Sequence, residues 1–373
     1  MNGKCTLFIL KFSNVTDGLK KETTTAIGIM SGTSLDGLDL CYAEFDFDGK
    51  WGFEIIASDC ISYDKKWSLN LANAHNCSAI DLEWLHDDFG KYIGENVNAF
   101  VEKHNLERPD MICSHGHTVF HEPAKKLTLQ IGNGNIISET TGIICVSDFR
   151  SLDVSLGGQG APLVPVGDEY LFSEYEACLN LGGFSNISFK EDGERRAFDI
   201  CPVNISLNSL ANFLDKPFDY NGEIARFGAL QPELLKQLNA LPIYNLDTRP
   251  SLAREWLVDV FNPLVENANC SVEDKLRTVT EHVTQQISDV INSRVGKGRV
   301  LVTGGGAKNG FLMERLSQLS SAEIVIPNLE ILDYKEALIF AFLGVLRMRD
   351  QNNVFRSVTG AQTDSCSGVI SYS

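Results

Sequence analysis

"AIGIMSGTSLDGLDLCYAEF", from Ala26 to Phe45, places a turn rich in glycine, serine, threonine and aspartate between two apolar runs. This pattern predicts a strand, a tight turn and a second strand. Glycines in such a turn let the backbone approach a ligand closely and point successive N–H groups at it. The stretch therefore predicts either a plain hairpin or a loop that holds an anion.

Two further stretches place glycines in a similar setting. "ACLNLGGFSNISFKEDG", from Ala177, has the same order of apolar run, glycine and serine turn, and alternating apolar positions. "RVLVTGGGAKNGFLMERLSQL", from Arg299, places three glycines between a β-rich run and an amphipathic helix. The likeness of the first two stretches indicates two related halves. The third predicts a strand, turn and helix suited to a nucleotide.

The remaining pattern alternates helices with short strands. Apolar residues recur every three or four positions in "IDLEWLHDDFGKYIGENVNAFVEKH", "KLRTVTEHVTQQISDVINSRV" and "KEALIFAFLGVLRMR", whereas "MICSH" and "GIICVSD" are short β-rich runs. The predicted fold class is α/β. A length of 373 residues favours two domains. We expect an N-terminal extension over 1–24, a first domain over 25–174 to which 335–373 return, and a second domain over 175–334.

Composition argues against several classes of function. The formal net charge of −17 repels phosphate backbones and anionic lipid heads, so we expect neither nucleic acid nor membrane as a partner. The 10 cysteines stand singly, without C-x-x-C pairs or metal-ligand spacing, which favours reduced thiols. No run approaches the ~20 apolar residues of a membrane span. These features predict a cytoplasmic protein that holds any anionic ligand locally.

The opening turn matches neither familiar nucleotide loop. Its glycines do not form G-x-G-x-x-G, and no G-K-[ST] follows them. It does contain Ser31, Thr33, Ser34 and Asp36. Hydroxyls and backbone N–H groups can hold phosphate oxygens, and a carboxylate beside them suits Mg²⁺ or its water shell. A hairpin rich in turn-forming residues is the alternative, and three such turns in one chain weigh against it.

Three other segments bring chemically useful side chains together. "SDFRSLDVSLGGQGAPLVP" places Asp148 and Arg150 before a glycine-rich stretch, as in a substrate clamp, with a surface salt bridge as the alternative. "SHGHTVFHEP" contains three histidines, but a zinc site needs further ligands at set spacing, so substrate contacts or satisfied loop histidines are favoured. Asp199 is either a general base at a strand end or the cap of the next helix, and its segment alone favours the cap. Glu336 lies near a predicted helix start, where an acidic residue is explained without any function by a favourable interaction with the helix dipole.

The motifs together resemble those of a known enzyme family. In order along the chain, "GIMSGTSLDGLD", "DFRSLDVSLGGQGAPLVP", "LNLGGFSNIS", "TGGGAKN" and "EALIFA" are similar to the motifs of the anhydro-N-acetylmuramic acid kinase family. That family belongs to the superfamily of sugar kinases, actin and heat-shock ATPases. The likeness extends from about Ile27 to Ala361, nearly the whole chain.

The resemblance implies a fold and a reaction. The implied fold has two related ribonuclease-H-like domains around a central cleft, with ATP deep between them. The implied reaction converts 1,6-anhydro-N-acetylmuramic acid, ATP and water into N-acetylmuramic acid 6-phosphate and ADP, as in the recycling of cell-wall sugar. ATP and Mg²⁺ are the implied cofactors, and a homodimer is a family expectation.

The resemblance also implies roles for single residues. Asp199 occupies the position of the family's base on the attacking water, which reverses the preference for a helix cap. Asp36 is expected near the metal. The residues implied to bind nucleotide or phosphate are Ser31, Gly32, Thr33, Ser34, Asp36, Gly182, Gly183, Ser185, Asn186, Gly304, Gly305, Gly306 and Asn309. The implied sugar contacts are His117, Thr118, Asp148, Arg150, Asn204 and Glu336.

Three segments depart from the family pattern. Cys201-Pro202-Val203-Asn204 stands where the family has G-P-G-N, so two backbone-permissive glycines are absent near Asp199. His115-Gly116-His117-Thr118 replaces H-G-Q-T, and Arg249 to Glu255 replaces K-S-T-G-R-E. The alternatives are therefore a kinase for another amino sugar or anhydrosugar, and a non-catalytic ATPase switch of the actin type. The retained Asp148-Phe149-Arg150 stretch favours the anhydromuramic sugar, and Asp199 weighs against a switch, which needs no base.

Overall fold

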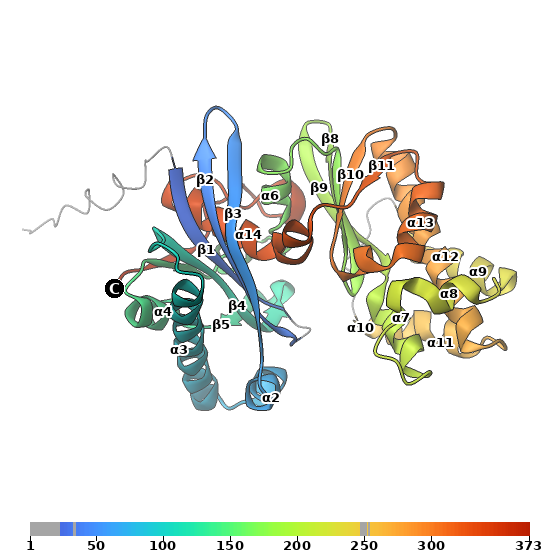
Figure 1. The fold of residues 1–373 in the computed structure, drawn as a ribbon, viewed down its shortest axis with the longest axis horizontal. Coiled ribbons are helices and arrows are strands. Elements are labelled where there is room, and N and C mark those ends of the chain that lie inside the picture. The colour runs from blue at the N-terminus through green and yellow to red at the C-terminus, as the bar shows by residue number, and fades with distance from the viewer. Residues whose placement is uncertain (1–22, 33–34, 247–251, 253) are drawn as a thin grey trace, which may run out of the picture. The chain divides into compact units, whose positions relative to one another are not determined.

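The chain divides into two compact units, drawn as a ribbon in Figure 1. The computed structural model describes residues 23–32, 35–246, 252 and 254–373. The first unit runs to Leu163 and resumes at Ala337, and the second comprises Val164–Glu336. Residues 164–174, which we expected in the first domain, thus belong to the second unit. The reason lies in helix α6, where Asp168 accepts a hydrogen bond from the Ser188 hydroxyl on the second unit's sheet.

A mixed seven-stranded sheet forms the centre of the first unit. Its order is β12-β6-β4-β1-β2-β3, and β5 pairs with β4. Strands β1 to β3 are antiparallel neighbours, whereas β4 is parallel to β1 and β6 is parallel to β4. The hairpin predicted from the opening stretch is confirmed, with Ser31 opposite Leu38 at its end. The strands are β1 (Thr23–Ser31), β2 (Gly37–Phe47), β3 (Trp51–Ser62), β4 (Met111–Glu122), β5 (Leu127–Ile131), β6 (Cys145–Ser147) and β12 (Val369–Ser371).

Helices pack against this sheet from both sides. Ile27 and Ile29 of β1 share a core cluster with Phe89 of helix α3. Gly28 between them faces the other way, because successive strand residues alternate sides. A Cβ at Gly28 would lie 1.8 Å from the carbonyl oxygen of Ala337 in helix α14, so only glycine lets α14 lie this close. The helices are α2 (Lys65–Asn73), α3 (Ala79–Lys103), α4 (Gly134–Thr141), α5 (Ser151–Ser155), α15 (Arg356–Thr359) and the part of α14 (Leu329–Met348) from Ala337.

The second unit repeats the topology of the first. Its five-stranded sheet has the order β11-β10-β7-β8-β9, with β7 to β9 antiparallel and β10 and β11 parallel to their inner neighbours. This order matches β6-β4-β1-β2-β3, strand for strand and direction for direction. The prediction of two related halves is confirmed, and the shared topology is that of a ribonuclease-H-like domain. The strands are β7 (Ala177–Leu181), β8 (Phe184–Glu191), β9 (Glu194–Pro202), β10 (Arg299–Thr303) and β11 (Glu323–Val325).

Helix α12 organises the helical part of the second unit. Leu276, Val279, Val283 and Ile287 recur at helical spacing and are fully buried, which confirms the predicted amphipathic helix. Ser271 caps the helix by accepting a hydrogen bond from the Asp274 N–H at 3.1 Å. The helices of this unit are α6 (Pro165–Tyr170), α7 (Asn204–Asn212), α8 (Glu223–Phe227), α9 (Pro232–Asn239), α10 (Arg254–Trp256), α11 (Asn262–Glu266), α12 (Val272–Val290), α13 (Gly310–Leu319) and the start of α14.

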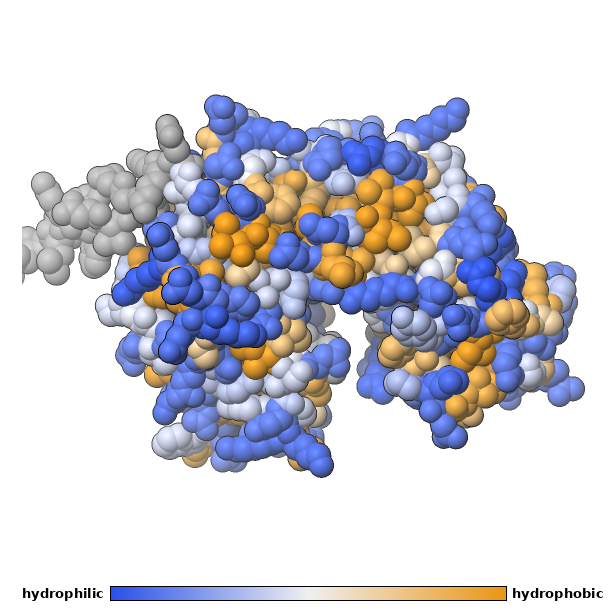
Figure 2. Space-filling view, viewed as in Figure 1, coloured by the Kyte–Doolittle hydropathy of each residue, from blue (hydrophilic) through white to orange (hydrophobic). Residues whose placement is uncertain are grey.

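Hydrophilic residues cover much of the face seen in Figure 2, as expected from a net charge of −17. Within the described ranges, no helix combines the length and the apolar character needed to cross a bilayer.

Candidate active site

Two glycine turns of the second unit meet at the start of helix α7. Gly304 follows β10 and leads into the predicted helix, here α13, while Gly182 and Gly183 join β7 to β8. Asn204, the first residue of α7, donates from Nδ2 to the Leu181 carbonyl at 3.0 Å and lies beside both turns. Its own N–H donates to the Gly182 carbonyl at 3.2 Å. The helix start thus fixes the two turns against each other.

A cavity of about 330 Å³ opens next to these turns, within the size range of small-molecule sites. It contains Gly305 and Asn309, both predicted to bind nucleotide. It also contains Asn204, which we expected among the sugar contacts. Sequence patterns missed Phe218 and Tyr220, because they lie in a loop far from every motif. The full lining is Asn204, Leu207, Asn208, Phe218, Asp219, Tyr220, Asn221, Gly305, Lys308 and Asn309.

Gly304 is a position where only glycine fits. Its φ is +85°, and an added Cβ would lie 2.5 Å from Asn180 Oδ1. We expect Gly304→Ala to lower the free energy of unfolding by about 1–3 kcal/mol and to weaken nucleotide binding, as measured by urea unfolding and ADP titration. Gly296→Ala is the matched control, because Gly296 has φ +69° but open space around the added Cβ. Equal losses in both variants would show that the clash at Gly304 has no effect.

A row of polar residues crosses the second sheet. Thr303 pairs with Asn180, Asn180 with Asn186, and Asn186 with Asp199, so four neighbouring strands each supply one member. Directly paired residues share a face of the sheet, which places these side chains side by side. Asn186 and Asp199 were predicted site residues. Asn180 and Thr303 were not, because the register that aligns them with Asp199 is invisible in the sequence.

Asp199 lies inside β9 and caps no helix. Helix α7 begins five residues later behind Val203, which forms no side-chain cap, so the cap suggested by the segment alone is wrong. The N–H of Leu252 donates to Asp199 Oδ2 at 2.9 Å. Burial raises the pKa of Asp199, and the bond from Leu252 opposes this only in part. The carboxylate is therefore fixed in place and more basic than a free one.

The two departures from glycine near Asp199 fill the core. Cys201 and Val203 are fully buried and belong to the main apolar cluster of the second unit. The Cys201 N–H donates to Ser185 Oγ at 3.2 Å, and that hydroxyl donates to the Cys201 carbonyl at 3.1 Å. The Ser185 side chain, predicted to bind phosphate, is thus bound to β9. Neither replacement lines the cavity described above.

In the first unit, the end of β1 is held by a chain of hydrogen bonds. Tyr63 donates its hydroxyl proton to Ser31 Oγ at 2.7 Å, and Ser31 Oγ lies 3.1 Å from His117 Nδ1. Burial lowers the pKa of His117 to about 4, so the ring is neutral and Nδ1 can accept from Ser31. The Ser31 hydroxyl, predicted to bind phosphate, and His117 thus bind each other.

The rest of the opening turn is only partly described. Thr33 and Ser34, both predicted to bind phosphate, lie outside the described residues. Gly32 and Asp36 lie on either side of them, and Asp36 is exposed. The Asp36 side chain is therefore accessible to solvent, one residue before β2 begins.

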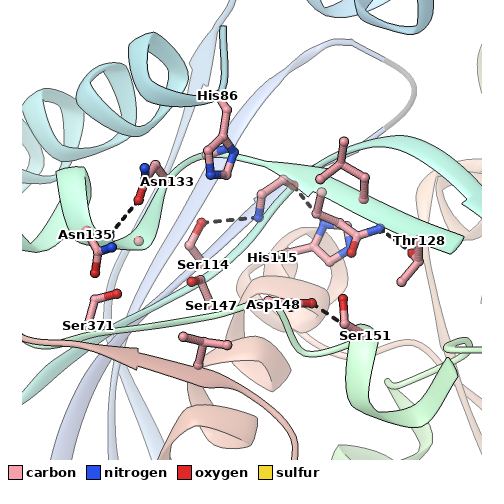
Figure 3. Close-up of a pocket in the computed structure, with 16 residues that line it drawn as sticks. His86, Ser114, His115, Thr128, Asn133, Asn135, Ser147, Asp148, Ser151 and Ser371 are labelled. Carbon is pink, nitrogen blue, oxygen red and sulfur yellow. Dashed lines mark hydrogen bonds between the residues drawn. The ribbon is translucent and has the colours of Figure 1, made fainter. Parts of the chain in front are cut away.

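A polar cavity of about 280 Å³ lies in the first unit (Figure 3). Asp148, a predicted sugar contact, lines it and accepts from the Ser151 N–H at 3.2 Å. Most other lining groups are hydroxyls and amides, which suit the hydroxyls of a sugar. Asp148 has a positive φ of 52°, a feature no sequence motif signals. The polar side chains around the cavity are His86, Ser114, His115, Thr128, Gln130, Asn133, Asn135, Ser147, Asp148, Ser151 and Ser371.

Arg150 holds His115, one of the residues that line this cavity, in place. Its Nε donates to His115 Nε2 at 3.0 Å, and its Nη1 donates to the Gly160 carbonyl at 2.6 Å. His115 Nδ1 lies 2.9 Å from the Gly116 carbonyl, so the ring is neutral with its proton on Nδ1. Burial, and next the charge of Arg150, lower the pKa of His115 well below its usual value. His115 and His117 thus form hydrogen bonds with different partners. The described residues include no group of three metal-ligating side chains.

Two other expected sugar contacts, Thr118 and Glu336, are not among the residues that line this cavity. Thr118 Oγ1 accepts from Gln130 Nε2 at 3.4 Å on neighbouring strands. Glu336 is exposed and lies beyond the first turn of α14. A favourable interaction with the helix dipole therefore does not account for an acidic residue at this position.

Known proteins similar to this chain cover nearly its full length. The family model of anhydro-N-acetylmuramic acid kinase matches residues 24–373. The anhydro-N-acetylmuramic acid kinase of Sulfurimonas denitrificans is 32% identical over 92% of this chain and 98% of its own. That of Vibrio cholerae serotype O1 is 35% identical over 94% and 99%. Among solved structures, a ROK family glucokinase from Streptomyces griseus in complex with glucose and AMPPNP superposes with a TM-score of 0.40 and 12% identity, over 86% of this chain and 98% of its own.

The repeated strand order defines two ribonuclease-H-like units, which is the fold class of sugar kinases, actin and heat-shock ATPases. Within it, the sequence relatives identify the branch. The chain belongs to the anhydro-N-acetylmuramic acid kinase family.

Proposed function

We propose that this chain phosphorylates 1,6-anhydro-N-acetylmuramic acid with ATP and opens its anhydro ring with water. Family membership supports this substrate and this reaction. The structural observation on which the proposal rests is the Asp199 carboxylate, which Leu252 holds and which burial makes more basic. A non-catalytic ATPase switch needs no such group.

In the proposed reaction, Asp199 accepts a proton from the water that attacks the anomeric carbon. The bond from that carbon to O6 breaks, and O6 forms a new bond to the γ-phosphorus as ADP leaves. N-acetylmuramic acid 6-phosphate and ADP are the products. A base whose pKa lies closer to the working pH accepts the proton more readily, so the burial of Asp199 favours this step.

We assign the nucleotide to the cavity of the second unit. Backbone N–H groups of glycine turns suit phosphate oxygens, and the cavity contains Gly305 and Asn309. Mg²⁺ is commonly held by one or two carboxylates together with phosphate oxygens and water. The exposed carboxylate of Asp36 is one donor of this kind. When bound, Mg²⁺ would offset the negative charge of the phosphates.

We assign sugar binding to the polar cavity of the first unit. Asp148 and the hydroxyls of Ser147, Ser151 and Ser371 offer acceptors and donors for sugar hydroxyls. Arg150 supports this cavity through His115. Its proposed role is to hold the wall in place.

The direct test is incubation of the purified protein with Mg²⁺-ATP and 1,6-anhydro-N-acetylmuramic acid. We expect N-acetylmuramic acid 6-phosphate by mass spectrometry, with one ¹⁸O at the anomeric position when the reaction is run in labelled water. N-acetylglucosamine and N-acetylmuramic acid serve as competing acceptors. No phosphosugar from the anhydro substrate, or faster turnover of another sugar, would contradict the proposal.

A further inference from the structure

Asn208 is the amide side chain in the cavity that we assign to the nucleotide for which the described residues supply no hydrogen-bond partner. Five other polar side chains that line it are already bound within the protein: Asn204, Asp219, Asn221, Lys308 and Asn309. In contrast, no residue in the described part of the chain forms a hydrogen bond with the carboxamide of Asn208. This donor and acceptor pair is therefore available to a ligand.

Helix α7 presents Asn208 on the side of the glycine turn. Asn208 follows Asn204 by one helical turn, so the two side chains lie on the same face. Asn204 lies beside Gly305 in the cavity wall. Leu207 adds an apolar surface next to them. The carboxamide is thus close to where the glycine turn ends and the apolar part of the cavity begins.

Two aromatic rings border the same cavity. Phe218 is 51% exposed and Tyr220 is 74% exposed, although both are large and largely apolar. Their ring centroids lie 6.5 Å apart. Exposed rings at the edge of a cavity provide a stacking surface for a planar ligand, and stacking on an aromatic ring does not distinguish one base from another.

We propose that Asn208 forms hydrogen bonds with the purine base and makes this cavity selective for adenine over guanine. The inference rests on the proposed function, which places a nucleoside triphosphate here. A carboxamide has one acceptor beside one donor, which matches the N6 amino group and N7 of adenine. Guanine presents two acceptors, O6 and N7, at the same edge, so one of the two contacts is lost.

The test compares binding of ADP and GDP by calorimetry in the wild type and in four variants. We expect the wild type to prefer ADP. Asn208→Ala should weaken ADP binding by about 5- to 150-fold and GDP binding by a clearly smaller factor, because guanine has only one of the two contacts to lose. Tyr220→Ala should weaken both by a similar factor. Asn212→Ala, on the same helix but exposed and outside the cavity, should alter neither. Asn208→Leu keeps a side chain of similar size but removes both the donor and the acceptor, and should lose ADP preference even if the alanine variant folds poorly.

Parallel assays with ATP and GTP separate the two proposals. Absence of phosphosugar from the anhydro substrate with either nucleotide would contradict the proposed function. A wild-type enzyme that makes phosphosugar, with an unchanged ratio of ADP to GDP affinity in the Asn208 variants, would contradict the role of Asn208. A wild type that binds neither nucleotide would contradict both.

Discussion

Replacing Asp199 with asparagine is expected to lower kcat by about 10²–10⁴-fold, the usual contribution of a positioned general base. Asparagine keeps the shape of the side chain, and its carbonyl oxygen can still accept from the Leu252 N–H that now binds Oδ2 at 2.9 Å. It cannot take a proton from water. Phosphosugar formation, followed by coupled detection of ADP, measures the loss. ADP binding should change little, because Asp199 does not line the cavity that we assign to the nucleotide.

Stability provides the control for this variant. The pKa of Asp199 is raised in the folded chain, so its contribution to stability is fully present below the unfolded pKa of about 3.9 and is lost as the pH rises. Asp199→Asn should therefore be at least as stable as the wild type at pH 7, by thermal unfolding. Asp192→Asn is the matched activity control, since Asp192 is exposed in the turn after β8. Inactive Asp199→Asn protein with a lowered melting temperature would indicate a structural role.

The pH dependence of the wild type follows from the same shift. The base works only when ionised, so kcat should fall as the pH drops through the raised pKa of Asp199. The acidic limb of the profile should thus lie above the value of about 3.9 for a free aspartate. An acidic limb at or below that value would contradict the assignment of Asp199 as the base.

The glycine turns were predictable because each combines a local turn signal with flanking apolar runs. The opening hairpin, the β7–β8 hairpin and the strand, turn and helix around Gly304 all formed where expected. Asp199 was predictable as a site residue only through the family motif, because its segment alone favoured a helix cap. Local sequence patterns thus located the turns, but they did not locate Asp199, the proposed base.

Features that depend on register or on distant segments could not be predicted. The alignment of Asn180 and Asn186 with Asp199 depends on how three strands pair. Phe218 and Tyr220, which border the cavity that we assign to the nucleotide, lie in a loop with no motif. Likewise, the hydrogen bond between Ser31 and His117 joins residues 86 positions apart, and no local sequence pattern signals it.

Asp168→Ala is expected to lower the free energy of unfolding by about 3–5 kcal/mol, because it leaves the buried ammonium group of Lys335 without its carboxylate partner. Asp168, Lys335 and Arg195 are all nearly inaccessible. Lys335 Nζ lies 2.6 Å from Asp168 Oδ1, and Arg195 Nη2 lies 3.8 Å from Oδ2. Urea unfolding measures the change. Asp333→Ala is the matched control, because Asp333 binds Lys308 at the same 2.6 Å but in an exposed pair, for which about 0–1 kcal/mol is expected.

The pH dependence of this loss identifies its cause. Burial alone would raise the pKa of Asp168, but the charges of Lys335 and Arg195 outweigh it and the pKa is lowered. A carboxylate with a lowered folded pKa stabilises the fold above its unfolded pKa of about 3.9, and this contribution is lost as the pH falls. The deficit of Asp168→Ala should therefore be full at pH 7 and shrink below about pH 4. A deficit independent of pH would attribute the loss to packing, and the ion pair between α6 and α14 would then contribute nothing to the second unit.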